Sequence, residues 1–123
     1  MVEQSGDPVG STGFRVGESQ VGQAVVLAVS GEVDALTAPQ LAEAIHTALA
    51  TGPATLIVDL SKVKFFASAG MTVLVAARTE AGPSTRFGVV ADGAATSRPI
   101  KLMGIDAVLP LYSTLDGALS GIA

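Results

Sequence analysis

The chain has 123 residues, of which 49% are hydrophobic and 15% charged, and this composition is typical of one globular domain. Its 7 basic and 11 acidic residues give a net charge of −4, and the cations are scattered, so we expect neither nucleic acid nor an anionic membrane as a partner. The absence of cysteine and the single histidine exclude a disulfide framework, a thiolate zinc site and a histidine cluster.

The N-terminal residues differ in composition from the rest. Residues 1–12, MVEQSGDPVGST, are polar and rich in glycine and serine, which predicts a flexible arm before a domain over 13–123. No apolar run reaches the roughly 18 residues of a membrane span, and no basic head precedes an apolar core near the start. We therefore expect a cytoplasmic protein.

Five apolar segments predict β-strands. The first two, 14–18 and 24–30, flank turn residues, and the second is apolar throughout, so we expect it to be buried on both faces. The third, 54–60, ends at a short polar loop, and the fourth is 85–92. The fifth, 107–112, contains a proline, which removes a ladder donor and places it at a sheet edge.

Four segments between and after these strands predict helices. The first, 36–52, carries its apolar residues on one face, with Thr37 as the expected cap and His46 off that face, in solvent. A second passes through 71–82, a short third lies within 94–104 with Ser97 as its cap, and 113–123 forms a fourth. After the opening hairpin, strands and helices alternate, which predicts an α/β domain with a mostly parallel, mixed sheet of four to five strands.

Polar residues follow three of these strands. Asp34, the loop at 65–70 and Asp92 come after successive strands, and we expect them to lie side by side at the carboxyl edge of the sheet, where ligands and partners tend to bind. No phosphate-binding glycine motif is present, and Ser68 has no base near it in the sequence. We therefore expect no catalytic residues, no cofactor and no metal.

Three segments resemble one family. LAVSGEVDALTAPQLAEAI, LIVDLSKVKFFASAGMTVLVAA and SRPIKLMGIDAVLPLYSTLDGAL are similar, in this order, to the signatures of STAS domains, above all the bacterial anti-sigma factor antagonists. The resemblance runs from about residue 14 to the end. It implies a single STAS-type domain that binds an anti-sigma factor, usually a serine kinase, and thereby frees a sigma factor for transcription. We expect it to be a monomer when free.

The chain departs from the family at the regulatory site. Members carry D-S-S-G and are phosphorylated on the second serine, whereas this chain has Ala67-Ser68-Ala69-Gly70, so the acceptor position is Ala69, without a hydroxyl. Three interpretations stay open. The protein is an antagonist that always remains competent to bind; or the acceptor has moved to Ser68; or the domain has diverged toward another partner or a small ligand.

The resemblance and the strand ends together predict a partner-binding set, which is Asp34, Thr37, Phe66, Ala67, Ser68, Ala69, Gly70, Met71 and Asp92. Structural roles compete for several of them. Asp34 also suits a turn, Thr37 and Ser68 also suit helix caps, Gly70 allows close packing, and Met71 suits the core. Two alternatives stay open for Phe65 and Phe66. Both belong to the core, or one of them is an exposed interface anchor, since side chains alternate along a strand. The rival function is a small-ligand or nucleotide sensor at the same edge.

Overall fold

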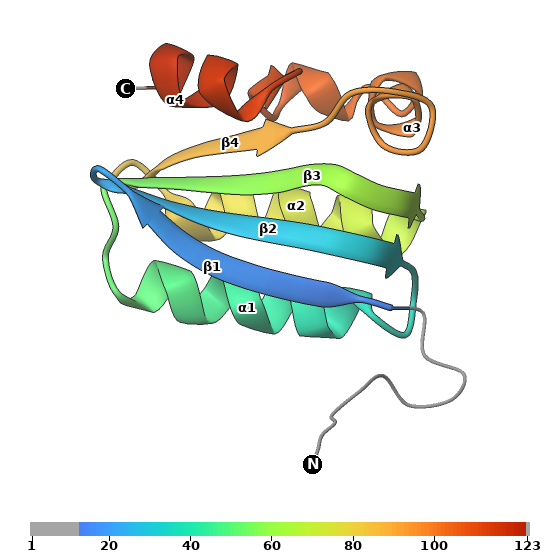
Figure 1. The fold of residues 1–123 in the computed structure, drawn as a ribbon, viewed down its shortest axis with the longest axis horizontal. Helices are drawn as coiled ribbons and strands as arrows, with labels where there is room; N and C mark the ends of the chain where they lie inside the picture. The colour runs from blue at the N-terminus through green and yellow to red at the C-terminus, as the bar shows by residue number, and fades with distance from the viewer. Residues whose placement is uncertain (1–12, 123) are drawn as a thin grey trace.

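A computed structural model describes residues 13–122, so the predicted N-terminal arm lies outside the described residues. The described part forms one sheet with the strand order β1-β2-β3-β4-β5 (Figure 1). The strands are β1 (Arg15–Val21), β2 (Ala24–Val33), β3 (Thr55–Phe66), β4 (Arg86–Val90) and β5 (Leu111–Tyr112). Only β1 and β2 pair antiparallel, so the predicted α/β fold with a mostly parallel mixed sheet is confirmed.

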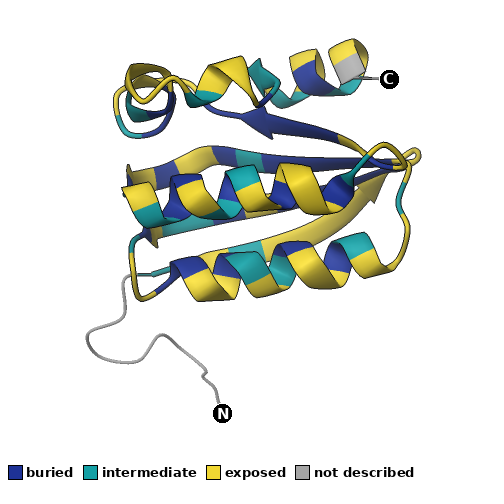
Figure 2. Cartoon of the chain, turned by 180° about the vertical axis from the view of Figure 1, so that it is seen from behind, coloured by how far each residue is buried: buried dark blue, intermediate teal, exposed yellow. Residues whose placement is uncertain are grey.

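The helices lie on both faces of this sheet. α1 (Ala38–Ala50) and α2 (Ser68–Ala81) cover one face side by side, with their buried residues turned toward the strands (Figure 2). α3 (Ser97–Leu102) and a 3-10 turn, Ile105–Ala107, follow β4, and α4 (Leu115–Ile122) packs on the opposite face. Four α-helices are thus found among the described residues, as the sequence predicts.

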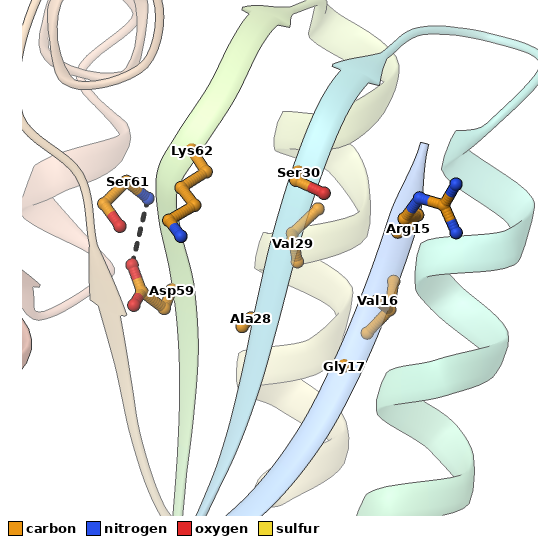
Figure 3. A pocket seen from close by; sticks show the side chains of 9 residues that line it. All are labelled: Arg15, Val16, Gly17, Ala28, Val29, Ser30, Asp59, Ser61 and Lys62. Atoms are coloured by element: carbon orange, nitrogen blue, oxygen red, sulfur yellow. Dashed lines mark hydrogen bonds between the residues drawn. The ribbon is translucent and has the colours of Figure 1, made fainter. Parts of the chain in front are cut away.

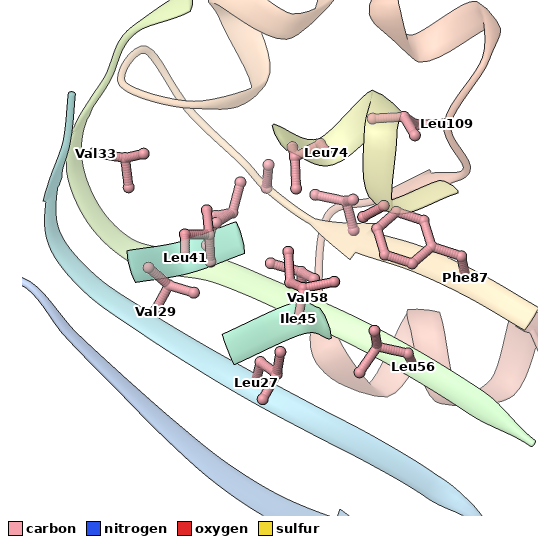
Figure 4. Packing of buried hydrophobic residues seen from close by; sticks show 14 of the residues in the cluster. Leu27, Val29, Val33, Leu41, Ile45, Leu56, Val58, Leu74, Phe87 and Leu109 are labelled. Atoms are coloured by element: carbon pink, nitrogen blue, oxygen red, sulfur yellow. The ribbon is translucent and has the colours of Figure 1, made fainter. Parts of the chain in front are cut away.

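Alternation along β3 divides the apolar side chains between the two faces. Leu56 and Val58 join the large cluster under α1 and α2, which also contains Ile45 and Leu74 (Figure 4). Ile57, between them, turns to the smaller cluster under α4. Each fully buried side chain of this size contributes about 1.5–3 kcal/mol to folding, so the face under α1 and α2 provides most of the apolar stabilisation.

The longest strand, β3, contains the segment expected to be a polar loop. Its buried residues after Val58 are Leu60, Val63 and Phe66, three apart rather than two. The strand accommodates this spacing because its pairing with β2 shifts twice, between Ala28 and Ser30 and between Gly31 and Glu32. Each shift leaves an extra residue on β3, as in a β-bulge, and returns the next apolar side chain to the core. The loop prediction for this segment is therefore wrong.

Two other strands differ from their predicted extent. β2 continues to Val33, and Ala28 is exposed although its neighbours Leu27 and Val29 are buried, so burial on both faces holds only for the first half. β5 covers only Leu111–Tyr112. Pro110 precedes it and has no N–H to donate, but its carbonyl oxygen accepts a hydrogen bond from the Val89 amide at 3.0 Å.

Ala28 is exposed because no helix covers this part of the sheet. A shallow trough of about 710 Å³ lies across β1, β2 and β3 (Figure 3). Gly17 and Ala28 pair directly across the two strands and form its floor, while the charged side chains of Arg15, Asp59 and Lys62 line it. The Asp59 Oδ1 accepts a hydrogen bond from the Ser61 amide at 2.9 Å, at the first register shift of β3.

Candidate partner-binding site

β2, β3 and β4 run parallel, so their carboxyl ends point to the same edge of the sheet. The loops after β2 and β3 start side by side, because Val33 pairs with Phe66. β4 ends earlier, with Val90 paired with Asp59, so the loop that carries Asp92 does not start beside the other two, in contrast to the prediction. The loop after β3 is joined to the end of β2 by a hydrogen bond from the Ala67 amide to the Val33 carbonyl, at 2.8 Å. We call this edge, with the residues 34–37, 65–72 and 92–103, the docking edge.

The loop between β2 and α1 is held by its own polar groups. The Asp34 Oδ1 accepts hydrogen bonds from the amides of Leu36 and Thr37 at 2.9 and 3.0 Å. Thr37 is the N-cap residue of α1, but its hydroxyl makes no cap bond to the helix. That hydroxyl accepts from the Asp34 amide and donates to the Glu32 carbonyl, both at 2.9 Å.

These contacts correct the expectation for Thr37 and show a turn role for Asp34. Thr37 is buried, so its predicted contact with a partner is replaced by a role inside the loop. Asp34 has the turn role that the sequence left open, because its Oδ1 forms an Asx-type turn. The result is a loop whose tip, Leu36, is 82% exposed. No sequence pattern marks Leu36, because a lone apolar residue in a loop has neither strand nor helix periodicity.

The end of β3 separates the two neighbouring phenylalanines. Phe66 pairs with Val33 and is only 4% exposed, within the core, whereas Phe65 pairs with Glu32 and is 51% exposed. Phe66 was expected to contact a partner, but its burial prevents that contact. Phe65 is the residue of the pair that faces solvent, because the second register shift turns the side chains over just before it.

The chain leaves β3 and enters α2 within one residue. Ala67 is the N-cap of α2, with extended φ and ψ of −87° and 171°, and its carbonyl accepts hydrogen bonds from the amides of Gly70 and Met71. Ser68 is thus the first helical residue and not the cap that was predicted, because Ala67 is still tied to Val33 by its own amide. No side chain among the described residues caps this helix start.

Gly70 and Met71 anchor the helix start to the core. A Cβ at Gly70 would lie 2.7 Å from both Phe66 Cε1 and Val33 Cγ1, so only glycine lets α2 approach the sheet this closely. Met71 is buried, in agreement with the core role that the sequence left open. Ser68 is exposed and Ala67 and Ala69 are half-buried, so these three residues are the part of the ASAG segment that a partner would meet.

An apolar groove begins beside Ser68. It has a volume of about 390 Å³ and runs between one face of α2 and the segment after α3, with Thr72, Val75, Met103 and Ile105 among its lining residues. Met103 is 64% exposed at its rim. A groove of this kind suits an apolar side chain of a protein partner better than a charged metabolite.

The third loop of the docking edge carries charge. Asp92 is exposed, as its predicted role requires, and it lines a hollow of about 520 Å³ together with Arg98 and Lys101. Ser97 does not cap α3 as predicted, because the N-cap residue is Thr96. The Ser97 hydroxyl instead closes the loop: it accepts a hydrogen bond from the Gly93 amide at 2.9 Å and donates one to the Gly93 carbonyl at 3.0 Å. Among the described residues no group of three or more His, Cys, Asp or Glu side chains is placed to hold a metal ion.

Comparison with protein families matches residues 16–111 to the family described as "Mlab, STAS domain". The chain belongs to the STAS domain family. The anti-sigma-F factor antagonist RsfB of Mycobacterium tuberculosis is 47% identical to this STAS domain over 97 residues, which are 79% of this chain and 80% of that protein.

Solved structures agree with this assignment. An anti-sigma factor antagonist from Mycobacterium paratuberculosis superposes on this STAS domain with a TM-score of 0.87 at 43% sequence identity, covering 90% of this chain and 95% of the other. The Thermotoga maritima protein TM1081 has a TM-score of 0.79 at 20% identity, covering 87% and 93%, and shares the fold. None of the helices described for this STAS domain is long and apolar enough to cross a membrane.

Proposed function

We propose that this STAS domain is an anti-sigma factor antagonist that binds an anti-sigma factor of the serine-kinase type through the docking edge and so frees a sigma factor. The names of the relatives at 43% and 47% identity support the assignment. The observation that carries the site is the exposed start of α2, where Ser68 opens onto an apolar groove and Ala69 stands at the family's phosphoacceptor position. Partner contacts are proposed for Asp92, Ala67, Ser68 and Ala69.

The same geometry supports binding without a kinase switch at residue 69. A phosphate adds about −1.5 to −2 charges at neutral pH, and at this helix start that charge would stand against the partner's surface. Ala69 has a methyl group instead of a hydroxyl, so the domain stays competent to bind. Ser68, exposed one residue earlier, is the remaining candidate for modification in this turn.

Calorimetry with purified anti-sigma factors tests the proposal. The unmodified domain should form a one-to-one complex. Ala69→Glu should weaken this complex by about 10²-fold, because the new carboxylate would lose its water in the interface without gaining an opposite charge. Gln23→Glu, which adds the same charge at the opposite end of the sheet, is the matched control and should bind as the wild type does. Equal affinity of Ala69→Glu and the wild type would remove this corner from the interface.

Incubation with a kinase-type partner and ATP, followed by intact-mass measurement, tests the switch. We expect no phosphate on the wild type and one phosphate on Ala69→Ser, since the substitution restores the acceptor hydroxyl. A phosphate on the wild type that disappears in Ser68→Ala would instead assign the acceptor to Ser68.

A small-ligand sensor is the second candidate. The hollow lined by Asp92, Arg98 and Lys101 favours it, because two cations beside a strand end suit an anionic ligand. A thermal-shift screen with nucleotides distinguishes the two functions. A sensor should gain stability as RT ln(1 + [L]/Kd), whereas an antagonist should show no shift with nucleotides.

A further inference from the structure

We propose that Leu36 is an anchor residue that inserts into an apolar pocket of the anti-sigma factor, and that Asp34 positions this anchor by hydrogen bonding and not by charge. This inference rests on the function proposed above and names contacts of the same docking edge. It differs from the sequence-based expectation, in which Asp34 itself meets the partner.

The first argument is the exposure of Leu36. Its side chain is 82% exposed although it is separated by one residue from the buried Ala38 of α1. An exposed leucine gains nothing from packing within its own chain, whereas a partner that covered it would remove most of its apolar surface from water. Interface residues that dominate binding lie in well-packed pockets from which water is excluded, so the anchor role requires that the partner offer such a pocket to Leu36.

The second argument is the rigidity of the loop that carries it. The Asp34 Oδ1 accepts from the amides of Leu36 and Thr37, and the Thr37 hydroxyl ties the loop to the Glu32 carbonyl. The Ala38 amide adds a bond to the Asp34 carbonyl at 2.8 Å. Because the backbone of the loop is fixed before binding, docking Leu36 costs little conformational entropy.

The third argument concerns which partner covers this leucine. The loop follows directly from β2, whose last residue Val33 accepts the amide bond from Ala67 at the start of α2. Phe65, half exposed, pairs with Glu32 on the same strand end. Leu36 therefore continues the surface around Ser68, and a partner seated on that surface reaches the loop as well. The partner that covers Leu36 is therefore the anti-sigma factor.

The role of Asp34 has a specific chemical signature. Asparagine offers the same Oδ1 acceptor without a charge, so Asp34→Asn keeps the bonds to Leu36 and Thr37, whereas Asp34→Ala removes them. If Asp34 acts by position, the asparagine variant rescues the binding that the alanine variant loses. If Asp34 pairs with a cation of the partner, both variants lose it.

The experiment measures the Kd of the full chain for its anti-sigma factor with wild type, Leu36→Ala, Asp34→Ala, Asp34→Asn and Val21→Ala. Val21 is also partly exposed and apolar, but it lies at the turn between β1 and β2, at the opposite end of the sheet. We expect Leu36→Ala to raise the Kd on the order of 10- to 100-fold with an unchanged melting temperature. Val21→Ala should bind as the wild type does.

Asp34→Ala should raise the Kd and lower the melting temperature, and Asp34→Asn should restore most of both. Wild-type affinity in Leu36→Ala would overturn the anchor, and a loss in Asp34→Asn at unchanged melting temperature would overturn the positioning role. A wild type that binds no anti-sigma factor would instead refute the proposed function. Sedimentation of the free protein should give a monomer, and a dimer that Leu36→Ala dissociates would show that a second copy covers the leucine.

Discussion

Ala67 follows β3 and is the N-cap of α2, and its side chain has no hydrogen-bond acceptor. Its extended backbone is the conformation in which Ser, Asp or Asn would accept a bond from the first turn of the helix. The D-S-S-G pattern that the resemblance implies for the family has an aspartate at this position. Under the proposed function, this chain thus combines an uncapped helix start with an alanine at the acceptor position two residues later. The two changes affect stability and regulation separately.

Restoring the cap should stabilise the fold. We expect Ala67→Asp to raise the free energy of unfolding by about 0.5–2 kcal/mol, because its carboxylate accepts an amide hydrogen bond and interacts favourably with the helix dipole. Urea denaturation measures the change. Ala67→Asn caps without charge and isolates the hydrogen bond from the dipole contribution, and unchanged midpoints in both variants would show that the helix start is satisfied by water alone.

At the scale of elements, α1 and α2 meet through two kinds of contact. Ile45 of α1 lies in the core, 1% exposed, while its neighbour His46 reaches Glu80 of α2 in solvent, with Nδ1 and Oε2 2.6 Å apart. An exposed pair of this kind contributes between 0 and about 1 kcal/mol, whereas a truncated buried isoleucine leaves a cavity. Packing should therefore outweigh the contact between His46 and Glu80 in holding the helices together.

Two substitutions at adjacent positions separate these contributions. We predict that Ile45→Ala lowers the free energy of unfolding by about 2–5 kcal/mol and that His46→Ala lowers it by less than about 1 kcal/mol. Both replace a side chain with alanine in the middle of the same helix, so helix propensity changes little between them. Thermal or chemical denaturation measures both changes in the free energy of unfolding, and a larger loss for His46→Ala than for Ile45→Ala would contradict the prediction.

The sequence predicts elements well where their apolar spacing has one interpretation. Residues 41, 45 and 48 follow a helical period, and α1 forms around them. Leu60, Val63 and Phe66 do not follow a strand period, because two register shifts determine which of them reach the core. The same shifts decide that Phe65 is exposed. Spacing alone cannot reveal a shift that depends on the partner strand. Which of Phe65 and Phe66 faces solvent could therefore not be predicted from the sequence.

At the scale of the whole molecule, all proposed contacts lie at one end of the sheet. The strand order and register place the loops after β2 and β3 together, and β4 points the same way. The turns at the other end, near Gln23, Ala54 and Ser84, form a separate surface. That arrangement follows from parallel pairing, which the alternation of strands and helices in the sequence predicts. The side chains that the loops present depend on local hydrogen bonds and could not be predicted in the same way.

Hydrogen exchange of the complex should show that the partner covers only this end of the sheet. Amides at 34–37 and 68–69 should exchange more slowly when the anti-sigma factor is bound, because the partner covers them, while the amides of residues 22, 23 and 84 should exchange as in the free protein. Mass spectrometry of peptides from both ends provides the comparison. Protection confined to the amides of residues 22, 23 and 84 would place the partner at the opposite end of the sheet and contradict the proposal.

The two extra residues of β3 also decide where the strand can change in length. Lys64 is the extra residue at the second shift, so its deletion would leave Val63, Phe65 and Phe66 in regular alternation, with Phe66 still in the core. The gap that admits Gly70 would keep its Phe66 wall. A deletion between Leu56 and Val58, where β3 pairs with β2 without a shift, would instead turn every following side chain to the other face.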